Sequence, residues 1–163
     1  MIQRIQTVYL ALVVILSFVC LISNIGEWTV AEATVAHFSN FTFGAEGAFK
    51  SLDSISGPWC LGVLLIMVEF LSVVTIMLFR KRMRQLRLTI LSTILLAGYA
   101  ITYAVFTYYY QLNLEQVAPA GLVPTFHVKF IGLFPVLSII LNCLAIHGIR
   151  KDEALVRSLD RIR

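Results

Sequence analysis

The chain has 163 residues, of which 59% are hydrophobic and only 13% charged, and its mean hydropathy is +0.86. A soluble domain of this length exposes about half of its residues to water, so this composition excludes one and indicates that lipid surrounds much of the chain. The formal net charge of +4 would suit a nucleic-acid-binding protein, but the basic residues cluster beside hydrophobic runs, where a membrane-orientation signal explains them better.

Four long hydrophobic runs predict transmembrane helices at about 5–25, 58–79, 88–110 and 130–149, and Glu69 is the only Asp, Glu, Lys or Arg within them. Each run has about 20 residues or more, enough to cross a hydrocarbon core about 30 Å thick as a helix. Lipid offers the backbone no hydrogen-bond partners, so each run is expected to be helical. The predicted fold is an all-α, four-helix transmembrane bundle that forms a single membrane domain over residues 1–163.

The basic residues predict the orientation of these helices. One side of the predicted membrane receives 11 of the 13 Lys and Arg residues, namely Arg4, Arg80, Lys81, Arg82, Arg84, Arg87, Arg150, Lys151, Arg157, Arg161 and Arg163. Only Lys50 and Lys129 fall on the other side. The positive-inside rule therefore places both termini and the short middle loop in the cytoplasm. The five basic residues of the middle loop could also bind anionic lipid headgroups, although a topology signal suffices to explain them.

Two outer loops, 26–57 and 111–129, connect the predicted helices. Residues 34–43 are rich in β-branched and aromatic side chains and precede a turn-like segment at 44–47, which predicts a small strand or β-hairpin. The second loop contains Pro119, Gly121 and Pro124 and is predicted to be irregular. The cytoplasmic tail, 150–163, is amphipathic, so it either continues the fourth helix or lies on the inner membrane surface.

The two ends of the chain carry a family resemblance. The opening MIQRIQTVYL and the closing IRKDEALVRSLDRIR resemble an uncharacterised Bacteroidota family of short four-helix inner-membrane proteins, known only as a domain of unknown function. The resemblance implies a bacterial cytoplasmic (inner) membrane and brings no assigned catalytic residues. The order of helices and loops is also similar to that of claudin-type tetraspans. Their first outer loop has a Trp followed by two cysteines, whereas Trp59 is followed by Cys60 alone, so this similarity is architectural only.

Glu69 is the residue most suggestive of function, because it lies near the middle of the second hydrophobic run. A carboxylate at the bilayer midplane costs roughly 2.5–3.5 kcal/mol on insertion scales. Depth along the runs places Ser17, Asn142 and either Tyr99 or Thr102 at a similar level, which predicts one buried polar layer. Three interpretations stay open for Glu69: an interhelical hydrogen-bond clamp, a proton or ion site, and a contact with a partner protein's helix.

No motif for catalysis, metal binding or cofactor binding stands out in the sequence. Cys20, Cys60 and Cys143 have no CxxC spacing, and the three histidines, His37, His127 and His147, are scattered. We therefore expect no cofactor, no metal and no enzymatic activity, because an enzyme acting on lipid would need several polar groups at one interface.

Two functions remain after this exclusion. The preferred hypothesis is a non-enzymatic accessory or scaffold subunit of a larger inner-membrane assembly. The alternative is a small oligomeric transporter or proton-coupled channel that uses Glu69. The expected partners are the lipid bilayer and either another membrane protein or further copies of this chain, and nucleic acid is not expected.

Overall fold

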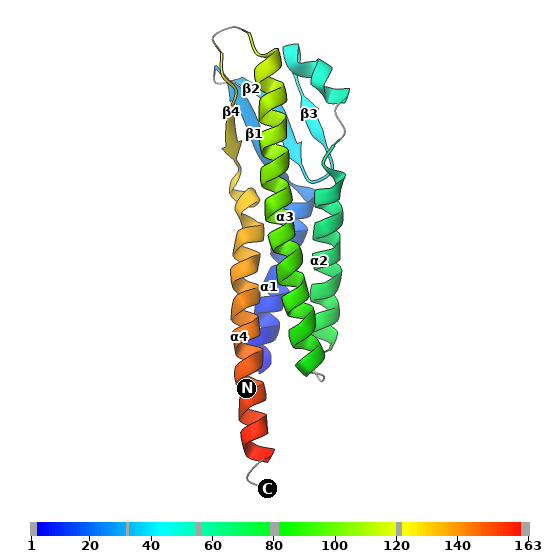
Figure 1. Ribbon diagram of the computed structural model, residues 1–163, viewed down its shortest axis with the longest axis vertical. Coiled ribbons are helices and arrows are strands. Elements are labelled where there is room, and N and C mark those ends of the chain that lie inside the picture. The colour runs from blue at the N-terminus through cyan, green and yellow to red at the C-terminus, as the bar shows by residue number, and fades with distance from the viewer. Residues whose placement is uncertain (1–2, 32, 55–56, 79–81, 120–121, 161–163) are drawn as a thin grey trace.

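The structure is a computed structural model, and it describes residues 3–31, 33–54, 57–78, 82–119 and 122–160. Four long helices lie side by side, with a small antiparallel sheet at one end (Figure 1). The helices are α1 (Gln3–Ile22), α2 (Trp59–Met77), α3 (Arg82–Val117) and α4 (Phe134–Asp160). Two short 3-10 helices, η1 (Gly47–Ser54) and η2 (Phe130–Leu133), precede α2 and α4.

Each long helix buries a stripe of residues that recurs at intervals of three and four. The buried positions are Gln6, Leu10, Val13, Ser17 and Cys20 on α1; Leu61, Leu65, Val68, Ser72 and Thr75 on α2; Gln85, Thr89, Ser92, Leu96 and Tyr99 on α3; Ser138, Asn142, Ala145, Ile149 and Asp152 on α4. This average spacing of 3.5 residues is the pattern of helices that pack nearly parallel or antiparallel, at about 20°. Both α1 and α3 pack against α2 and α4, so the helices form a ring around a shared interior.

Three of these helices are long and apolar enough to cross a membrane: Trp59–Met77, Met83–Val117 and Phe130–Ala154. The described apolar part of α1, Gln6–Ile22, is shorter. Large hydrophobic side chains cover the outside of the ring, for example Ile15, Phe70, Ile94 and Ile140. An apolar exterior around a partly polar interior indicates a membrane protein, because a helical bundle in water places its polar side chains outside and its apolar side chains inside.

The sheet draws its strands from two distant segments of the chain. Strands β1 (Asn24–Val30), β2 (Ala33–Ser39) and β3 (Phe43–Ala45) lie between α1 and α2, whereas β4 (Thr125–Val128) lies between α3 and α4. The order is β3-β2-β1-β4, and every neighbouring pair is antiparallel. The outer part of α3 covers one face of this sheet (Figure 1). We call the sheet, η1 and the part of α3 after Tyr99 the outer module.

Aromatic side chains fill the space between the sheet and α3. Trp28 is fully buried on β1, with its ring centroid 4.6 Å from that of Phe126 and 5.7 Å from that of Phe43. Phe43 stacks on Tyr110 of α3 at 4.1 Å. The Trp28 indole N–H donates to Gln111 Oε1 over 2.8 Å, so the single polar group of this buried side chain has a hydrogen-bond partner.

The helices differ in extent from the predicted runs, and α3 extends beyond its run at both ends. It begins six residues before the predicted start at 88 and ends seven residues after the predicted end at 110. The extension beyond 110 includes the fully buried Leu114, which packs into the outer module. A hydropathy run ends where lipid ends, so it cannot show that a helix continues by packing on a sheet. At the other end, α4 continues through the tail as far as Asp160.

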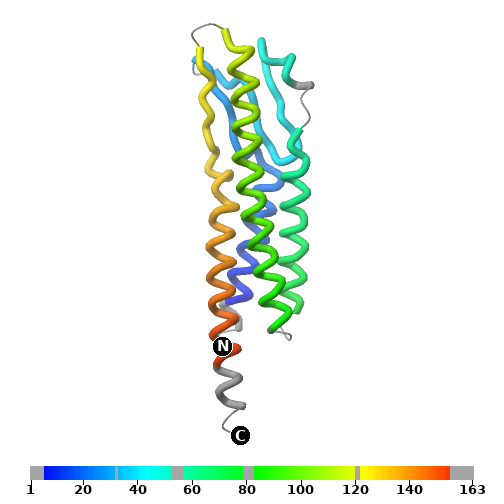
Figure 2. The backbone as a smooth tube through the Cα atoms, in the orientation of Figure 1, coloured from blue at the N-terminus to red at the C-terminus, as the bar shows by residue number. Residues whose placement is uncertain are grey.

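The outer loops are more ordered than the sequence indicated. The first loop holds three strands. The chain reverses direction at residues 40–42, where the Ser39 N–H donates to the Thr42 carbonyl. This turn comes earlier in the chain than the predicted turn at 44–47. The prediction of an irregular second loop was wrong, because β4 lies there and pairs with β1. Both ends of the described chain lie away from the sheet: α1 begins and α4 ends at the opposite end of the molecule (Figure 2).

Candidate functional site

The five residues predicted to form one polar layer are divided among several separate contacts. Ser17 on α1 neighbours the Glu69 carboxyl group on α2. Glu69 is partly buried, and its Oε2 atom is enclosed without a hydrogen-bond partner among the described residues. On α4, Asn142 donates from Nδ2 to Ser92 Oγ over 3.2 Å, while its Oδ1 atom has no partner in the described part of the chain.

The other two predicted residues make different contacts. The Thr102 hydroxyl donates to the Gly98 carbonyl of its own helix over 2.8 Å. The Tyr99 hydroxyl donates to Asn40 Oδ1 over 2.8 Å, outside the helices altogether. Ser92 lies two turns below Tyr99, about 10 Å along α3, so the Asn142 and Tyr99 contacts occupy different levels.

Asn40, in the turn between β2 and β3, joins the sheet to three helices, and it was not among the residues that the sequence analysis singled out. Its side chain is fully buried and donates from Nδ2 to the Cys20 carbonyl of α1 over 2.6 Å. It also accepts from Tyr99 of α3, and its main-chain carbonyl accepts from the Gly62 N–H of α2 over 3.0 Å. A Cβ atom at Gly62 would clash with the Phe41 ring, so any larger residue here would require that ring to move.

Further polar side chains are buried at the end of the helices away from the sheet. Gln6 Nε2 donates to Asp152 Oδ2 over 2.6 Å, and Thr75 and Gln85 occupy buried positions near the ends of the other two helices. Among the predicted headgroup or topology residues, Arg84 and Arg87 are exposed and Arg82 begins α3. Arg80 and Lys81 lie outside the described residues.

Charged and ionisable side chains line the face of the sheet that points away from α3. Glu27 on β1 is paired in register with His37 on β2 and with His127 on β4. Lys129 Nζ lies 2.8 Å from Glu27 Oε2, and this hydrogen bond is the main cause that lowers the pKa of Glu27 below its ordinary value. Within the part of the chain that the structure describes, no three His, Cys, Asp or Glu side chains are arranged to hold a metal ion.

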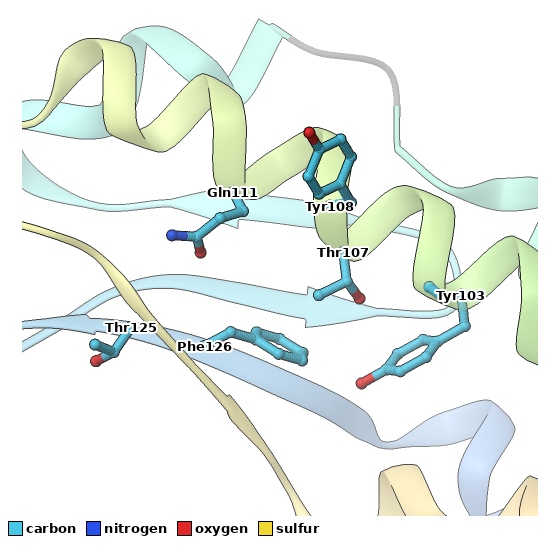
Figure 3. Close-up of a pocket in the computed structure, with 7 residues that line it drawn as sticks. Tyr103, Thr107, Tyr108, Gln111, Thr125 and Phe126 are labelled. Atoms are coloured by element: carbon cyan, nitrogen blue, oxygen red, sulfur yellow. The ribbon is translucent and has the colours of Figure 1, made fainter.

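A groove of about 650 Å³ runs between the outer part of α3 and β4 (Figure 3). Its lining comprises Tyr103, Ala104, Thr107, Tyr108 and Gln111 from α3 and Thr125 and Phe126 from β4. This volume falls within the range of about 300–1,000 Å³ that is typical of small-molecule sites. None of the lining side chains is charged, so the groove suits an uncharged or amphiphilic occupant.

Two hydroxyl groups in this groove stand out. Tyr103 and Thr107 neighbour each other on α3, and both oxygens are buried without a well-formed hydrogen bond among the described residues. By contrast, the Gln111 amide is fully used, because Nε2 donates to the Pro124 carbonyl over 2.8 Å and to Glu115 over 2.7 Å. The two oxygens are thus enclosed, and the groove lining also carries the polar side chains of Tyr108, Gln111 and Thr125.

Comparison with known proteins places the chain in a family without an assigned activity. A family model described as a domain of unknown function (DUF4293) matches residues 2–162. The chain belongs to this family. A search of curated proteins finds no match to this DUF4293 chain. The match confirms the predicted membership of a family known only as a domain of unknown function, and it supplies no catalytic residues.

Proposed function

We propose that this DUF4293 protein is a non-enzymatic accessory or scaffold subunit of a larger assembly in the bacterial cytoplasmic membrane. In this proposal all four long helices cross the membrane, both termini lie in the cytoplasm, and the outer module stands on the opposite side. The distribution of Lys and Arg along the sequence supports the orientation, since 11 of 13 fall before the first predicted helix, between the second and third, or after the fourth.

An exposed apolar stripe on α3 is the observation that carries the proposal. Ile101, Val105, Tyr108 and Leu112 recur at helical spacing and are 67%, 61%, 66% and 41% exposed. Tyr99 contacts Cys20 near the end of α1, so α3 continues for about 25 Å past the level at which α1 ends. Lipid can cover the start of this stripe but not its outer turns, and an apolar face in water marks a protein-binding surface.

Co-purification after mild extraction tests this proposal. A Leu112→Glu substitution places a charge in the stripe, and Leu122→Glu is its control, because Leu122 in the second outer loop is equally exposed, at 42% against 41%. We expect a larger partner to co-purify with the unchanged protein and with Leu122→Glu, and to be lost from Leu112→Glu. A protein that purifies as a lone monomer, or equal recovery of the partner with both variants, would contradict the proposal.

One set of atoms favours the alternative of transport. Glu69 Oε2, Ser72 Oγ, Ser138 Oγ and Asn142 Oδ1 are all buried in the helical region without a hydrogen-bond partner in the described structure. Buried polar atoms in this state are commonly satisfied by internal water, which a proton or ion path would need. However, Leu61, Leu65 and Leu96 are fully buried between the Asn142 level and the outer module, which favours a closed interior.

Replacement of Glu69 by Gln separates these two functions. Gln keeps the size and hydrogen-bonding capacity of the side chain but cannot titrate, so a proton-coupled flux in proteoliposomes would disappear with Glu69→Gln. An accessory subunit would show no flux in either form and would keep its partner with the substitution. A flux that survives Glu69→Gln would exclude proton coupling through this residue.

A further inference from the structure

We propose that the partner of this DUF4293 protein adds an extended segment of its own chain to the free edge of β4, with alternate side chains of that segment in the groove between α3 and β4. The inference rests on the accessory role proposed above and deepens it by stating how the partner is recognised. The added segment would lie antiparallel to β4, because every neighbouring pair of strands in this sheet is antiparallel.

The pairing of β1 with β4 shows which backbone groups of β4 point outwards. In an antiparallel pair, opposite residues alternate between those that exchange both of their hydrogen bonds and those that exchange none. The Lys129 N–H donates to the Ile25 carbonyl over 3.2 Å, so the next bonded residue on β4 is His127. The N–H and carbonyl groups of Phe126 and Val128 therefore point away from β1. Among the described residues, β4 is the last strand on this side of the sheet (Figure 1).

The two edges of the sheet differ in how well they are protected. At one edge, η1 packs against β3, which is only three residues long. At the other edge, Val128 is 49% exposed, and Thr125 and His127 are also exposed. Proteins often protect an open edge with proline or with lysine side chains. Here proline precedes the strand, and the lysine that follows it bonds Glu27 on the face away from α3, so β4 itself carries neither protection.

The groove beside this edge can receive side chains of an added strand. Directly opposite residues of paired strands point to the same face of a sheet, and Phe126 lies on the face towards α3, against Trp28 (Figure 3). Side chains opposite Phe126 and Val128 would therefore lie on the side of the groove, whose volume is about 650 Å³ and whose lining is uncharged. The side chain between them would lie on the face that carries His127 and Glu27. The segment should thus alternate apolar and polar residues.

The occupant is a different protein and not a second copy of this chain. Strand β4 runs roughly along the long helices (Figure 1), so a copy whose β4 paired antiparallel with it would have its helices inverted. Copies of one chain are inserted in a membrane with one orientation, which the Lys and Arg residues set. A different partner can cover the groove and the exposed stripe of α3 together, because Tyr108 belongs to both.

Hydrogen exchange of the co-purified complex, measured residue by residue and compared with the free protein, tests the strand addition. We expect the amides of Phe126 and Val128 to exchange about tenfold more slowly in the complex, as for the gain of one hydrogen bond each. The His127 amide, which already bonds β1, should change little. A complex in which the Phe126 and Val128 amides exchange as fast as in the free protein would overturn the inference.

A proline at the outward-facing position gives a second test. Val128→Pro removes the outward N–H, and Val128→Ala is its matched control, because alanine shortens the side chain and keeps the N–H. The pairing with β1 does not use this N–H, so proline should leave the proteolysis rate of the sheet nearly unchanged. We expect retention of the partner to fall about tenfold in Val128→Pro and to change little in Val128→Ala. Equal retention in the two variants would contradict strand addition.

A third pair of variants leaves the strand untouched. Ala104→Leu fills the groove, and Ala97→Leu is the matched control, since both alanines are exposed on α3 and only Ala104 lines the groove. We expect about tenfold weaker retention of the partner in Ala104→Leu alone, as for the loss of one or two buried methylene groups. A partner lost from Leu112→Glu but kept by both Val128→Pro and Ala104→Leu would overturn strand addition and leave the accessory role intact. A protein that purifies alone would overturn both.

Discussion

The two halves of α3 bury different side chains. In the half away from the sheet, three of the buried positions are polar, Gln85, Thr89 and Ser92, and Leu96 follows them; in the half beside the sheet, Tyr99, Tyr110 and Leu114 are buried. Lipid tails are as apolar as a helix surface, so no hydrophobic force drives helices together within a membrane, and small polar residues can occupy the interior. The outer module, which we place in water, depends on the burial of large aromatic surfaces.

The largest expected effect follows from removing the central aromatic side chain of the outer module. Trp28→Ala deletes a fully buried ring with several aromatic neighbours and leaves Gln111 without its donor. Such substitutions typically lower folding stability by about 3–5 kcal/mol, so the sheet should detach from α3 while the helices persist. Limited proteolysis measures whether the sheet detaches, and circular dichroism measures whether the helices persist.

The control for this substitution is the only other tryptophan, Trp59, which is 64% exposed at the start of α2. Trp59→Ala should leave the proteolysis rate of the sheet nearly unchanged. If Trp28→Ala unfolds the helices together with the sheet, the two regions are one cooperative unit, and the contrast between them describes composition only.

The second expected effect concerns the junction between the two regions. Asn40→Ala leaves the Tyr99 hydroxyl and the Cys20 carbonyl without their partner, and each buried unsatisfied group costs about 1–3 kcal/mol. Asn113→Ala is the matched control, because the Asn113 side chain donates to the Tyr109 carbonyl of its own helix and joins no second element among the described residues. Chemical denaturation in detergent should show a clear loss of folding stability for Asn40→Ala and at most a small loss of stability for Asn113→Ala.

The same substitution, tyrosine to phenylalanine, at Tyr99 and Tyr103 of α3 compares two hydroxyl groups one turn apart at the junction of the two regions. Tyr99→Phe removes a hydroxyl that bonds Asn40 and should cost about 1 kcal/mol of stability, whereas Tyr103→Phe removes a buried hydroxyl without a well-formed hydrogen bond among the described residues. In lipid-depleted detergent, Tyr103→Phe should therefore be neutral or slightly stabilising. A loss of stability with Tyr103→Phe that equals the loss with Tyr99→Phe would show that the Tyr103 hydroxyl has a partner within the protein.

The sequence predicted the helices well and the outer module poorly, for a physical reason. A membrane-crossing helix is specified locally, by about 20 consecutive apolar residues, and needs no knowledge of its neighbours. Strand β4 is specified by its partner β1, about 100 residues away in the chain, and its four residues, Thr125–Val128, carry no pattern of their own. A sheet that joins distant segments is defined by pairing and burial more than by local propensity.

The candidate site shows the same limit. Depth along each run correctly relates positions within one helix, but it cannot supply the rotation of that helix or the presence of a loop between helices. Either Tyr99 or Thr102 was predicted to share one polar layer with Glu69, whereas Tyr99 bonds Asn40, which enters from the turn between β2 and β3. The signal available was the polar Asn40 next to Phe41, a pair that reads as an ordinary exposed turn.

The smallest expected effect lies on the solvent face of the sheet. The Lys129 ammonium group lowers the pKa of Glu27 in the folded protein below the ordinary value of 4.5, so the folded state favours the ionised carboxylate. The stability that this pair contributes is therefore complete above pH 4.5 and is lost as the pH falls through the lowered folded value. Exposed ion pairs contribute about 0.2–1 kcal/mol, so the change is small.

Glu27→Gln should remove this acid-dependent loss of sheet protection in hydrogen exchange, while Glu115→Gln on α3, which leaves the pair intact, should retain it. An unchanged acid dependence in Glu27→Gln would assign the loss to another carboxyl group and leave the aromatic packing as the main support of the sheet.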